Sequence, residues 1–322
     1  MSMKARERAP LRKTRSRTIG VLVAVLGAAF VAHPAIAVPP AVTQRTFATP
    51  RAAADALVAA TTDFDAGALV EILGTDGEDL VVTGDPVLDR NQAADFASEA
   101  KEKIAVVTDP ANPKRATMTV GNGDWPVPIP IVEAGGRWRF DGAAGRQEVL
   151  LRRIGRNELD AIEVCRGYVE AQEEYASELR GDSKIYQFAQ HVIGTADKQD
   201  GLAWRDPDGT WRGPIGEKVA AAIAEGYSPK LDPYHGYYFK ILKGQGPAAP
   251  LGQLDYVIKG VMIGGFALVA SPAEYEVTGI KTFIVSNDGV VFQKDLGPKT
   301  LELFQKMERF DPDNTWSPVE EK

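Results

Sequence analysis

The stretch Asp232-Pro233-Tyr234-His235-Gly236-Tyr237-Tyr238-Phe239-Lys240-Ile241-Leu242 decides where the second half of the fold begins. Pro233 ends any preceding helix, and the aromatic residues that follow it favour a strand over residues 237–242. Turn residues held by a rigid sheet often carry binding groups. We therefore expect this stretch to open a C-terminal module and to carry the densest side-chain chemistry of the chain.

The sequence after this stretch predicts a sheet. A turn at Asn287-Asp288-Gly289 separates two strand-like runs, and Pro298 is placed to start a helix that runs to about residue 307. The full set of expected strands is 237–242, 254–258, 265–270, 281–286 and 290–294. We expect a four- or five-stranded antiparallel sheet backed by a helix, which gives a C-terminal module over residues 232–318 and a tail over 319–322.

The sequence before it predicts an α+β module over residues 47–181. Thr49-Pro50 is typical of a helix start, and Gly135-Gly136 indicates a hairpin. The expected helices are 51–61, 65–73, 89–103 and 157–180, and the expected strands are 116–120, 127–133 and 137–140. Helices followed by a meander indicate helices packed on one face of an antiparallel sheet, a pattern similar to that of the nuclear-transport-factor-like superfamily.

Residues 182–231 are rich in Gly, Pro, Asp and Lys and are expected to form an irregular connecting segment. Asp206-Pro207-Asp208-Gly209 is typical of a turn, and Pro214 favours a short helix that ends at Gly226. Trp204 and Trp211 flank the turn. They either pin a long loop or clamp a ligand, and both readings stay open at this point.

Residues 1–37 have the three-part form of a secretory signal peptide, with a basic start, an uncharged run over residues 18–32 and the small-residue site Ala35-Ile36-Ala37. The alternative is an uncleaved anchor, but the run is shorter than the ~20 residues that span a bilayer. We expect cleavage after Ala37, a flexible lead-in over residues 38–46, and a periplasmic or secreted protein with no stable membrane span after processing.

The charge balance excludes two classes of partner. The whole chain has a net charge of −7, and loss of residues 1–37 would lower it to −13 because seven basic residues and one acidic residue are removed. Nucleic acid and anionic lipid are bound by clustered Lys and Arg. An acidic chain of this kind predicts neither partner.

Few residues are available for catalysis. His191 and His235 are the histidines left after processing, and Cys165 is the single cysteine of the chain. Cys165 lies on the apolar face of the expected helix 157–180. This position favours packing in the core over a role as a nucleophile. A histidine-based zinc site needs three or four ligands with N or S donors, and two histidines and one buried thiol do not supply them. We therefore predict no metal and no cofactor, and the sequence favours a protein without catalytic activity.

Two functional hypotheses follow. The first is a non-catalytic binding or structural protein with a groove at the junction of the modules, which holds an envelope peptide, glycan or partner protein. Its expected binding residues are Trp125, Trp204, Tyr234, His235 and Tyr237. The alternative is a hydrolase that acts on an envelope polymer.

The hydrolase hypothesis assigns three roles. His235 is its base, Asp232 orients the imidazole, and Asp295 is an acid on the opposite side. A third reading, a structural spacer, applies if side chains fill the groove.

Several runs resemble a bacterial envelope family known as domain of unknown function 2950, over roughly residues 47–318. They are Gly123-Asp124-Trp125-Pro126-Val127-Pro128-Ile129-Pro130, Gly136-Arg137-Trp138-Arg139-Phe140-Asp141, Arg153-Ile154-Gly155-Arg156-Asn157-Glu158-Leu159, Ile162-Glu163-Val164-Cys165, Pro233-Tyr234-His235-Gly236-Tyr237-Tyr238-Phe239 and Lys294-Asp295-Leu296-Gly297. The resemblance implies export and no specific chemistry. Ala203 stands where the family pattern leads us to expect a tyrosine.

The C-terminal third also resembles the sheet of the soluble head of pilin-like proteins. The residues that carry this resemblance are Gly236-Tyr237-Tyr238-Phe239, Pro272-Ala273-Glu274-Tyr275, Thr278-Gly279, Phe283 and Asp288-Gly289-Val290. The sequence lacks a pilin leader and its long N-terminal assembly helix, so filament membership is not expected.

Overall fold

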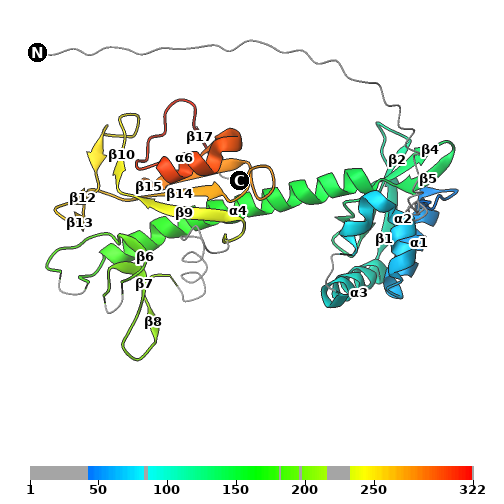
Figure 1. The fold of residues 1–322 in the computed structure, drawn as a ribbon, viewed down its shortest axis with the longest axis horizontal. Coiled ribbons are helices and arrows are strands. Elements are labelled where there is room, and N and C mark those ends of the chain that lie inside the picture. Colours follow the sequence, from blue (N-terminus) through cyan, green and yellow to red (C-terminus); the bar gives the residue numbers. More distant parts are fainter. Residues whose placement is uncertain (1–42, 83–85, 181–182, 196–197, 216–232, 321–322) are drawn as a thin grey trace, which may run out of the picture. The chain divides into compact units, whose positions relative to one another are not determined.

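The computed structural model describes residues 43–82, 86–180, 183–195, 198–215 and 233–320 (Figure 1). Its first elements are helices: α1 (Pro50–Thr62), α2 (Ala66–Leu73) and α3 (Pro86–Glu102), which the sequence predicts, and the 3-10 helix η1 (Thr75–Leu80), which it does not. Thr49 caps α1, since its hydroxyl accepts a hydrogen bond from the amide of Ala52. Asp65 caps α2 in the same way, through the amide of Ala68.

An antiparallel sheet follows these helices in the order β1-β2-β4-β5, with β3 paired to β2. The strands are β1 (Ile104–Thr108), β2 (Arg115–Val120), β3 (Trp125–Pro126), β4 (Ile131–Ala134) and β5 (Arg137–Phe140). Gly135 and Gly136 join β4 to β5 with positive φ at both residues, so the predicted hairpin is confirmed. A first hydrophobic cluster, from Phe47 to Phe140, joins the helices to this sheet.

Helix α4 (Gly142–Ala176) is much longer than the helix predicted over residues 157–180. The added N-terminal half contains glycines, which disfavour a helix in a sequence-based reading. Asp141 starts the helix by capping the amide of Ala144. Gly142 is required at the first position, because a Cβ there would lie 2.6 Å from the amide nitrogen of Gly77. Packing against η1 thus stabilises a helix start that propensity alone does not predict.

The second hydrophobic cluster begins inside α4, at Ala161, and extends to Phe310. It includes Cys165, Tyr168 and Tyr175 of α4. The helix that we expected to complete the N-terminal module therefore contributes its C-terminal half to the core of the C-terminal one. Residues 161–175 belong to that second core, and the predicted boundary at residue 181 falls after them.

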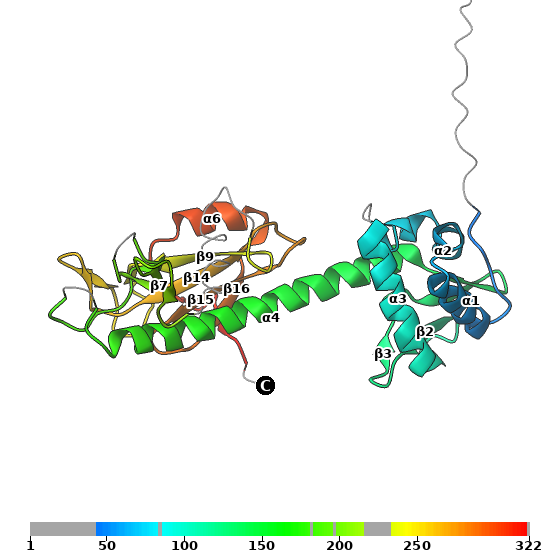
Figure 2. The same cartoon turned by 90° about the horizontal axis from the view of Figure 1, so that it is seen from below.

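A five-stranded antiparallel sheet in the order β17-β16-β15-β14-β9 forms the centre of this second part. Its strands are β9 (Tyr237–Leu242), β14 (Ala267–Pro272), β15 (Lys281–Ser286), β16 (Phe292–Asp295) and β17 (Ser317–Pro318). Helix α4 contacts β14 and β15, and α6 (Thr300–Lys306) contacts β14. The two helices lie on opposite faces of the sheet (Figures 1 and 2), and every residue of β14 is buried.

Short strands complete the second part. Strand β6 (His191–Ile193) is parallel to β7 (Gly201–Arg205), and β7 forms a hairpin with β8 (Trp211–Arg212) across the predicted turn at residues 206–209. The pairs β10 (Gly244–Gln245) with β11 (Leu254–Asp255) and β12 (Val257–Ile258) with β13 (Val261–Met262) follow. The segment expected to be irregular thus contains three strands, while residues 216–226 of the helix expected from Pro214 to Gly226 lie outside the described residues.

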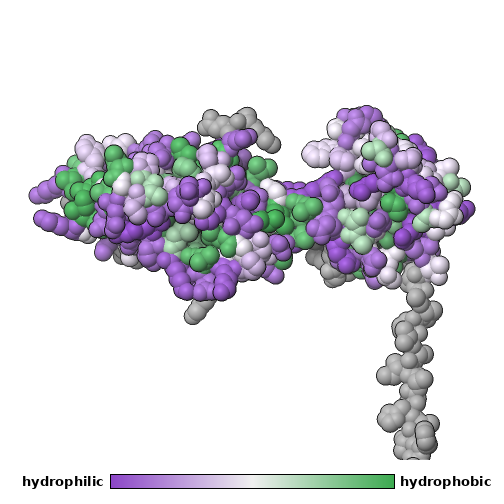
Figure 3. All heavy atoms as spheres, turned by 90° about the horizontal axis from the view of Figure 1, so that it is seen from above, coloured by the Kyte–Doolittle hydropathy of each residue, from purple (hydrophilic) through white to green (hydrophobic). Residues whose placement is uncertain are grey.

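The surface shown in Figure 3 is mainly polar, with scattered apolar patches. Exposed large apolar side chains include those of Trp125 and Leu251. Within the described ranges, no helix is both long enough and apolar enough to cross a membrane.

Candidate functional site

A two-residue turn before β9 holds His235 in a fixed conformation. His235 and Gly236 have φ angles of 47° and 75°, and the amide of Tyr237 donates a hydrogen bond of 2.9 Å to the carbonyl of Tyr234. Positive φ at both central residues is the pattern of a type I′ turn. A left-handed conformation is uncommon for a residue with a side chain, although histidine adopts it more readily than most.

Gly236 lets this turn pack closely against α4 and the segment of Thr278. A Cβ at Gly236 would lie 2.6 Å from Nδ2 of Asn157 on α4 and 2.8 Å from Cβ of Thr278. The side-chain amide of Asn157 donates a hydrogen bond of 2.8 Å to the carbonyl of Thr278, so the two neighbours are themselves tied together. The turn is therefore pressed against α4, and His235 is held beside that helix.

The imidazole of His235 pairs with a carboxylate from α4. Its Nδ1 is within hydrogen-bond distance of Oδ2 of Asp160, and the side chains of His235 and Asp160 are 49% and 28% exposed. The ring of Tyr234 packs on the imidazole with a centroid separation of 4.2 Å. With Nδ1 engaged, Nε2 is the ring nitrogen left to meet a ligand or water.

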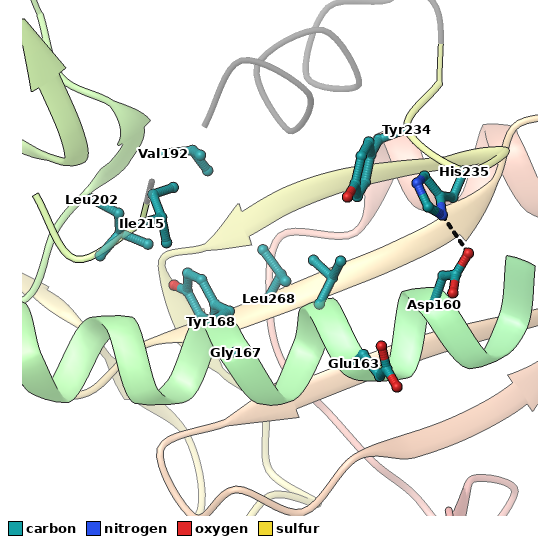
Figure 4. Close-up of a pocket in the computed structure, with 11 residues that line it drawn as sticks. Asp160, Glu163, Gly167, Tyr168, Val192, Leu202, Ile215, Tyr234, His235 and Leu268 are labelled. Atoms are coloured by element: carbon teal, nitrogen blue, oxygen red, sulfur yellow. Dashed lines mark hydrogen bonds and ion pairs between the residues drawn. The ribbon is translucent and has the colours of Figure 1, made fainter. Parts of the chain in front are cut away.

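This pair forms one end of a cavity of about 260 Å³ between α4, strand β14 and the segments that carry β6 and β7 (Figure 4). The described residues that line it are Asp160, Glu163, Val164, Gly167, Tyr168, Val192, Leu202, Ile215, Tyr234, His235 and Leu268. Figure 4 shows the ionisable groups Asp160 and His235 at one end, and Val192, Leu202 and Ile215 at the other. The cavity is therefore polar at one end and apolar at the other.

One face of α4 shapes this cavity. Asp160, Glu163 and Gly167 recur at spacings of three and four residues, which places them on the same side of a helix. A Cβ at Gly167 would meet no atom within 4 Å. A mid-helix glycine costs about 0.5–1 kcal/mol relative to alanine, and at Gly167 no close backbone approach requires it. The missing side chain keeps the wall of the cavity open.

Two of the residues predicted to bind a ligand, Tyr234 and His235, line this cavity, and three do not. Tyr237 is fully buried and donates its hydroxyl to the carbonyl of Lys281. Trp204 lies in the second hydrophobic cluster, where the guanidinium of Arg180 packs on its ring. Trp125 lies on β3 and is 69% exposed.

The catalytic set considered for a hydrolase does not come together as the sequence suggested. Pro272 pairs with Tyr237, and Lys281 pairs with Asp295. The register that pairs Ala270 with Phe283, continued by two residues, sets Pro272 opposite Lys281, so the four residues follow one line across four strands. Three strand spacings of ~4.8 Å put Asp295 about 14 Å from Tyr237. The carboxylate of Asp295 accepts hydrogen bonds from the hydroxyl of Tyr275 and the amide of Gly297.

Asp232, the expected orienter of His235, lies outside the described residues. Asp160 pairs with the imidazole, and sequence reasoning missed it because 75 positions separate it from His235. The available signal was the helical spacing of Asp160, Glu163 and the unusual Gly167.

Cys165 is fully buried, and burial raises the pKa of its thiol to about 12. A thiol with such a pKa holds almost no thiolate at neutral pH, so Cys165 is a core residue and not a nucleophile. Among the residues that the structure describes, no group of three or more His, Cys, Asp or Glu side chains is arranged to hold a metal ion.

Comparison with known proteins adds the family. The family model described as "Protein of unknown function (DUF2950)" matches residues 44–319. No curated protein and no solved structure matches the chain. The resemblance to pilin heads is therefore not shown.

Proposed function

The chain belongs to the family DUF2950, and we propose that it is an exported envelope protein that binds a small ligand, or one side chain of a larger partner, without chemical turnover. The site is the cavity between α4 and β14. Trp125 is not among its lining residues.

The polarity of the cavity is the observation that carries this proposal. Ligand sites are typically concave and mostly apolar, with a few fixed polar groups that set orientation. Here the type I′ turn and the contact with Asp160 fix His235, while Leu202, Ile215 and Leu268 supply apolar walls. A site with its polar groups already in place loses little entropy when it binds.

A matched pair of glycine variants tests this site. Gly167→Leu adds a side chain to the wall of the cavity, whereas Gly155→Leu adds the same side chain elsewhere on α4, where a Cβ also meets no atom within 4 Å. Both changes are expected to raise helix stability by about 0.5–1 kcal/mol. In a thermal-shift and ligand-observed NMR screen of amines, sugars and short peptides, only Gly167→Leu should lose the compounds that the wild-type protein binds. Equal binding by both variants would place the ligand elsewhere.

The Asp160–His235 pair favours hydrolysis as the second candidate function. A carboxylate that holds Nδ1 leaves Nε2 able to accept a proton from water, as in other carboxylate–histidine bases. Among the described lining residues there is no Ser, Thr or Cys, so the nucleophile would be water. Turnover of envelope polymer fragments by the wild-type protein, lost in His235→Asn, would establish this reaction; turnover that persists in the variant would reject it.

Export is the remaining part of the proposal, and it is supported by the sequence of residues 1–37. The expected mature N-terminus is Val38. Cell fractionation followed by mass spectrometry of the N-terminal peptide tests this. A chain that retains residues 1–37 in the membrane fraction would show an anchor instead.

A further inference from the structure

We infer that the ligand of this cavity joins a protonated amine to a compact apolar group. This inference rests on the proposed function, since it names the chemical class that the cavity between α4 and β14 takes. Three features of the lining point to it: the sign of its charge, its aromatic rings and its volume.

The described lining residues carry a negative charge. Asp160 and Glu163 are the carboxylates among them, and His235 is the one group among them that can become a cation. The contact with Asp160 already neutralises a protonated His235. Glu163 is exposed and has no hydrogen bond or ion pair with any described residue. An anionic ligand would therefore meet repulsion, and a cationic one would meet an available carboxylate.

Aromatic rings stand at the same end of the cavity as this charge. Figure 4 shows Tyr234 and His235 on the side opposite α4, with Asp160 and Glu163 on the helix. A cation within about 6 Å of the face of a tyrosine ring is attracted by the negative charge density of that face. An ammonium group between α4 and the ring of Tyr234 would be attracted by the carboxylate of Glu163 and by the ring.

The volume limits the apolar part. A cavity of about 260 Å³ corresponds to roughly nine water molecules at ~30 Å³ each. Val192, Leu202 and Ile215 line the end away from the carboxylates, and Leu268 lies between the two ends. A phenyl ring or a branched alkyl group with a short aminoalkyl arm matches both the size and the polarity of this space.

Three probes with the same ring separate charge from shape: phenethylamine, 2-phenylethanol and phenylacetate. Binding to the purified protein is measured by isothermal titration calorimetry and by saturation-transfer NMR. We expect phenethylamine to bind about fivefold more tightly than 2-phenylethanol, the upper value for a partly exposed ion pair. Phenylacetate should bind more weakly than the alcohol. The Gly167→Leu variant should bind none of the three.

Glu163→Gln supplies the charge test, and Glu170→Gln is its control because Glu170 is exposed on the same helix and does not line the cavity. Glu163→Gln should remove most of the preference for the amine over the alcohol, whereas Glu170→Gln should keep the preference of the wild-type protein. Equal binding of amine and alcohol to the wild-type protein would overturn the amine assignment and leave the binding function standing. Absence of binding by all three probes, together with an empty wider screen, would overturn both.

Discussion

Nδ1 of His235, in the turn before β9, lies within hydrogen-bond distance of a carboxylate oxygen of Asp160 on α4, and the two side chains are 49% and 28% exposed. The pair joins a helix to a turn across 75 residues of sequence. Because water screens it, we expect a coupling free energy between the two side chains of about 0.5–1 kcal/mol. A double-mutant cycle of Asp160→Ala and His235→Asn, measured by urea unfolding, tests this value. Asparagine is suitable because it tolerates the left-handed conformation of residue 235.

A second cycle is the control for this measurement. It combines His235→Asn with Glu170→Gln, which is two to three turns further along α4 and does not line the cavity. Distant sites add independently, so its coupling should be zero. Coupling in the first cycle should also fall in 1 M salt, which reduces the Debye length to ~3 Å. A coupling of zero at low salt would contradict an energetic contact between Asp160 and His235.

Gly236 should be far more sensitive to substitution than its conformation alone explains. Gly236 and Gly136 share a φ of 75°, and both are the second residue of a two-residue turn. A Cβ at Gly136 meets nothing within 4 Å, whereas one at Gly236 meets Asn157 and Thr278. Gly136→Ala should cost about 1–2 kcal/mol for the left-handed backbone. Gly236→Ala should cost a further 1–3 kcal/mol, roughly, for overpacking.

Unfolding midpoints and m-values in urea for the two alanine variants check this difference. Similar losses of stability in both would mean that Asn157 and Thr278 move aside at little cost. The turn would then not be a rigid support for His235.

The sequence predicted the parts of the fold that depend on local signals. Residues 237–242 and 281–286 are strands with the predicted bounds. Turn residues lie next to both runs, and such local signals fix where a strand begins or ends within a few residues. The start of α4 was missed because it depends on a contact between Gly142 and Gly77, and such contacts override helix propensity.

In the candidate site, too, the residues with a local sequence signal were predicted and those that depend on tertiary contacts were not. Tyr234 and His235 were identified from a local cluster of aromatic residues next to a strand. Asp160 and Gly167 were not, since an acid and a glycine on an amphipathic helix carry no local mark of a cavity. Their role depends on which face of α4 meets β14, and that is a tertiary property.

Gln172 should be essential for the order of the segment that precedes β6. It is fully buried, its carboxamide oxygen accepts a hydrogen bond of 2.8 Å from the amide of Ala189, and its nitrogen donates one of 2.9 Å to the carbonyl of the same residue. Gln172→Leu leaves the buried amide and carbonyl of Ala189 without these hydrogen-bond partners. A buried backbone group that is left unpaired costs about 1–3 kcal/mol. We expect a loss of about 2–4 kcal/mol in the free energy of unfolding.

The exposed neighbour Glu173 supplies the matched control. Glu173→Leu should change stability by no more than about 0.5 kcal/mol. Hydrogen exchange locates the effect: in Gln172→Leu the amide of Ala189 should exchange faster than the amides of β14. Unchanged protection at residue 189 would show that other contacts hold this segment.

The buried tyrosines should make the protein less stable at alkaline pH. Burial is the main cause that raises the pKa of Tyr175 and of Tyr256 to about 12, with Asp200 and Asp288 respectively adding to it, and burial also raises the pKa of Tyr237. An unfolded tyrosine titrates near 10. Between these values the native state holds protons that the unfolded state has lost, so the free energy of unfolding falls as pH rises from about 10 to 12.

Each such tyrosine contributes a slope of about 1.4 kcal/mol per pH unit inside that window. Cys165 acts in the same direction from about pH 9, because its pKa is raised from 9.0 to about 12. Urea unfolding at pH 8, 9, 10 and 11 measures the slope. Tyr256→Phe should reduce this slope by about 1.4 kcal/mol per pH unit, the contribution of one tyrosine. Tyr186→Phe, at an exposed position, should leave the slope unchanged. A slope that is the same in the wild-type protein and in Tyr256→Phe would mean that Tyr256 ionises as readily in the folded state as in the unfolded one, and it would contradict a pKa raised by burial.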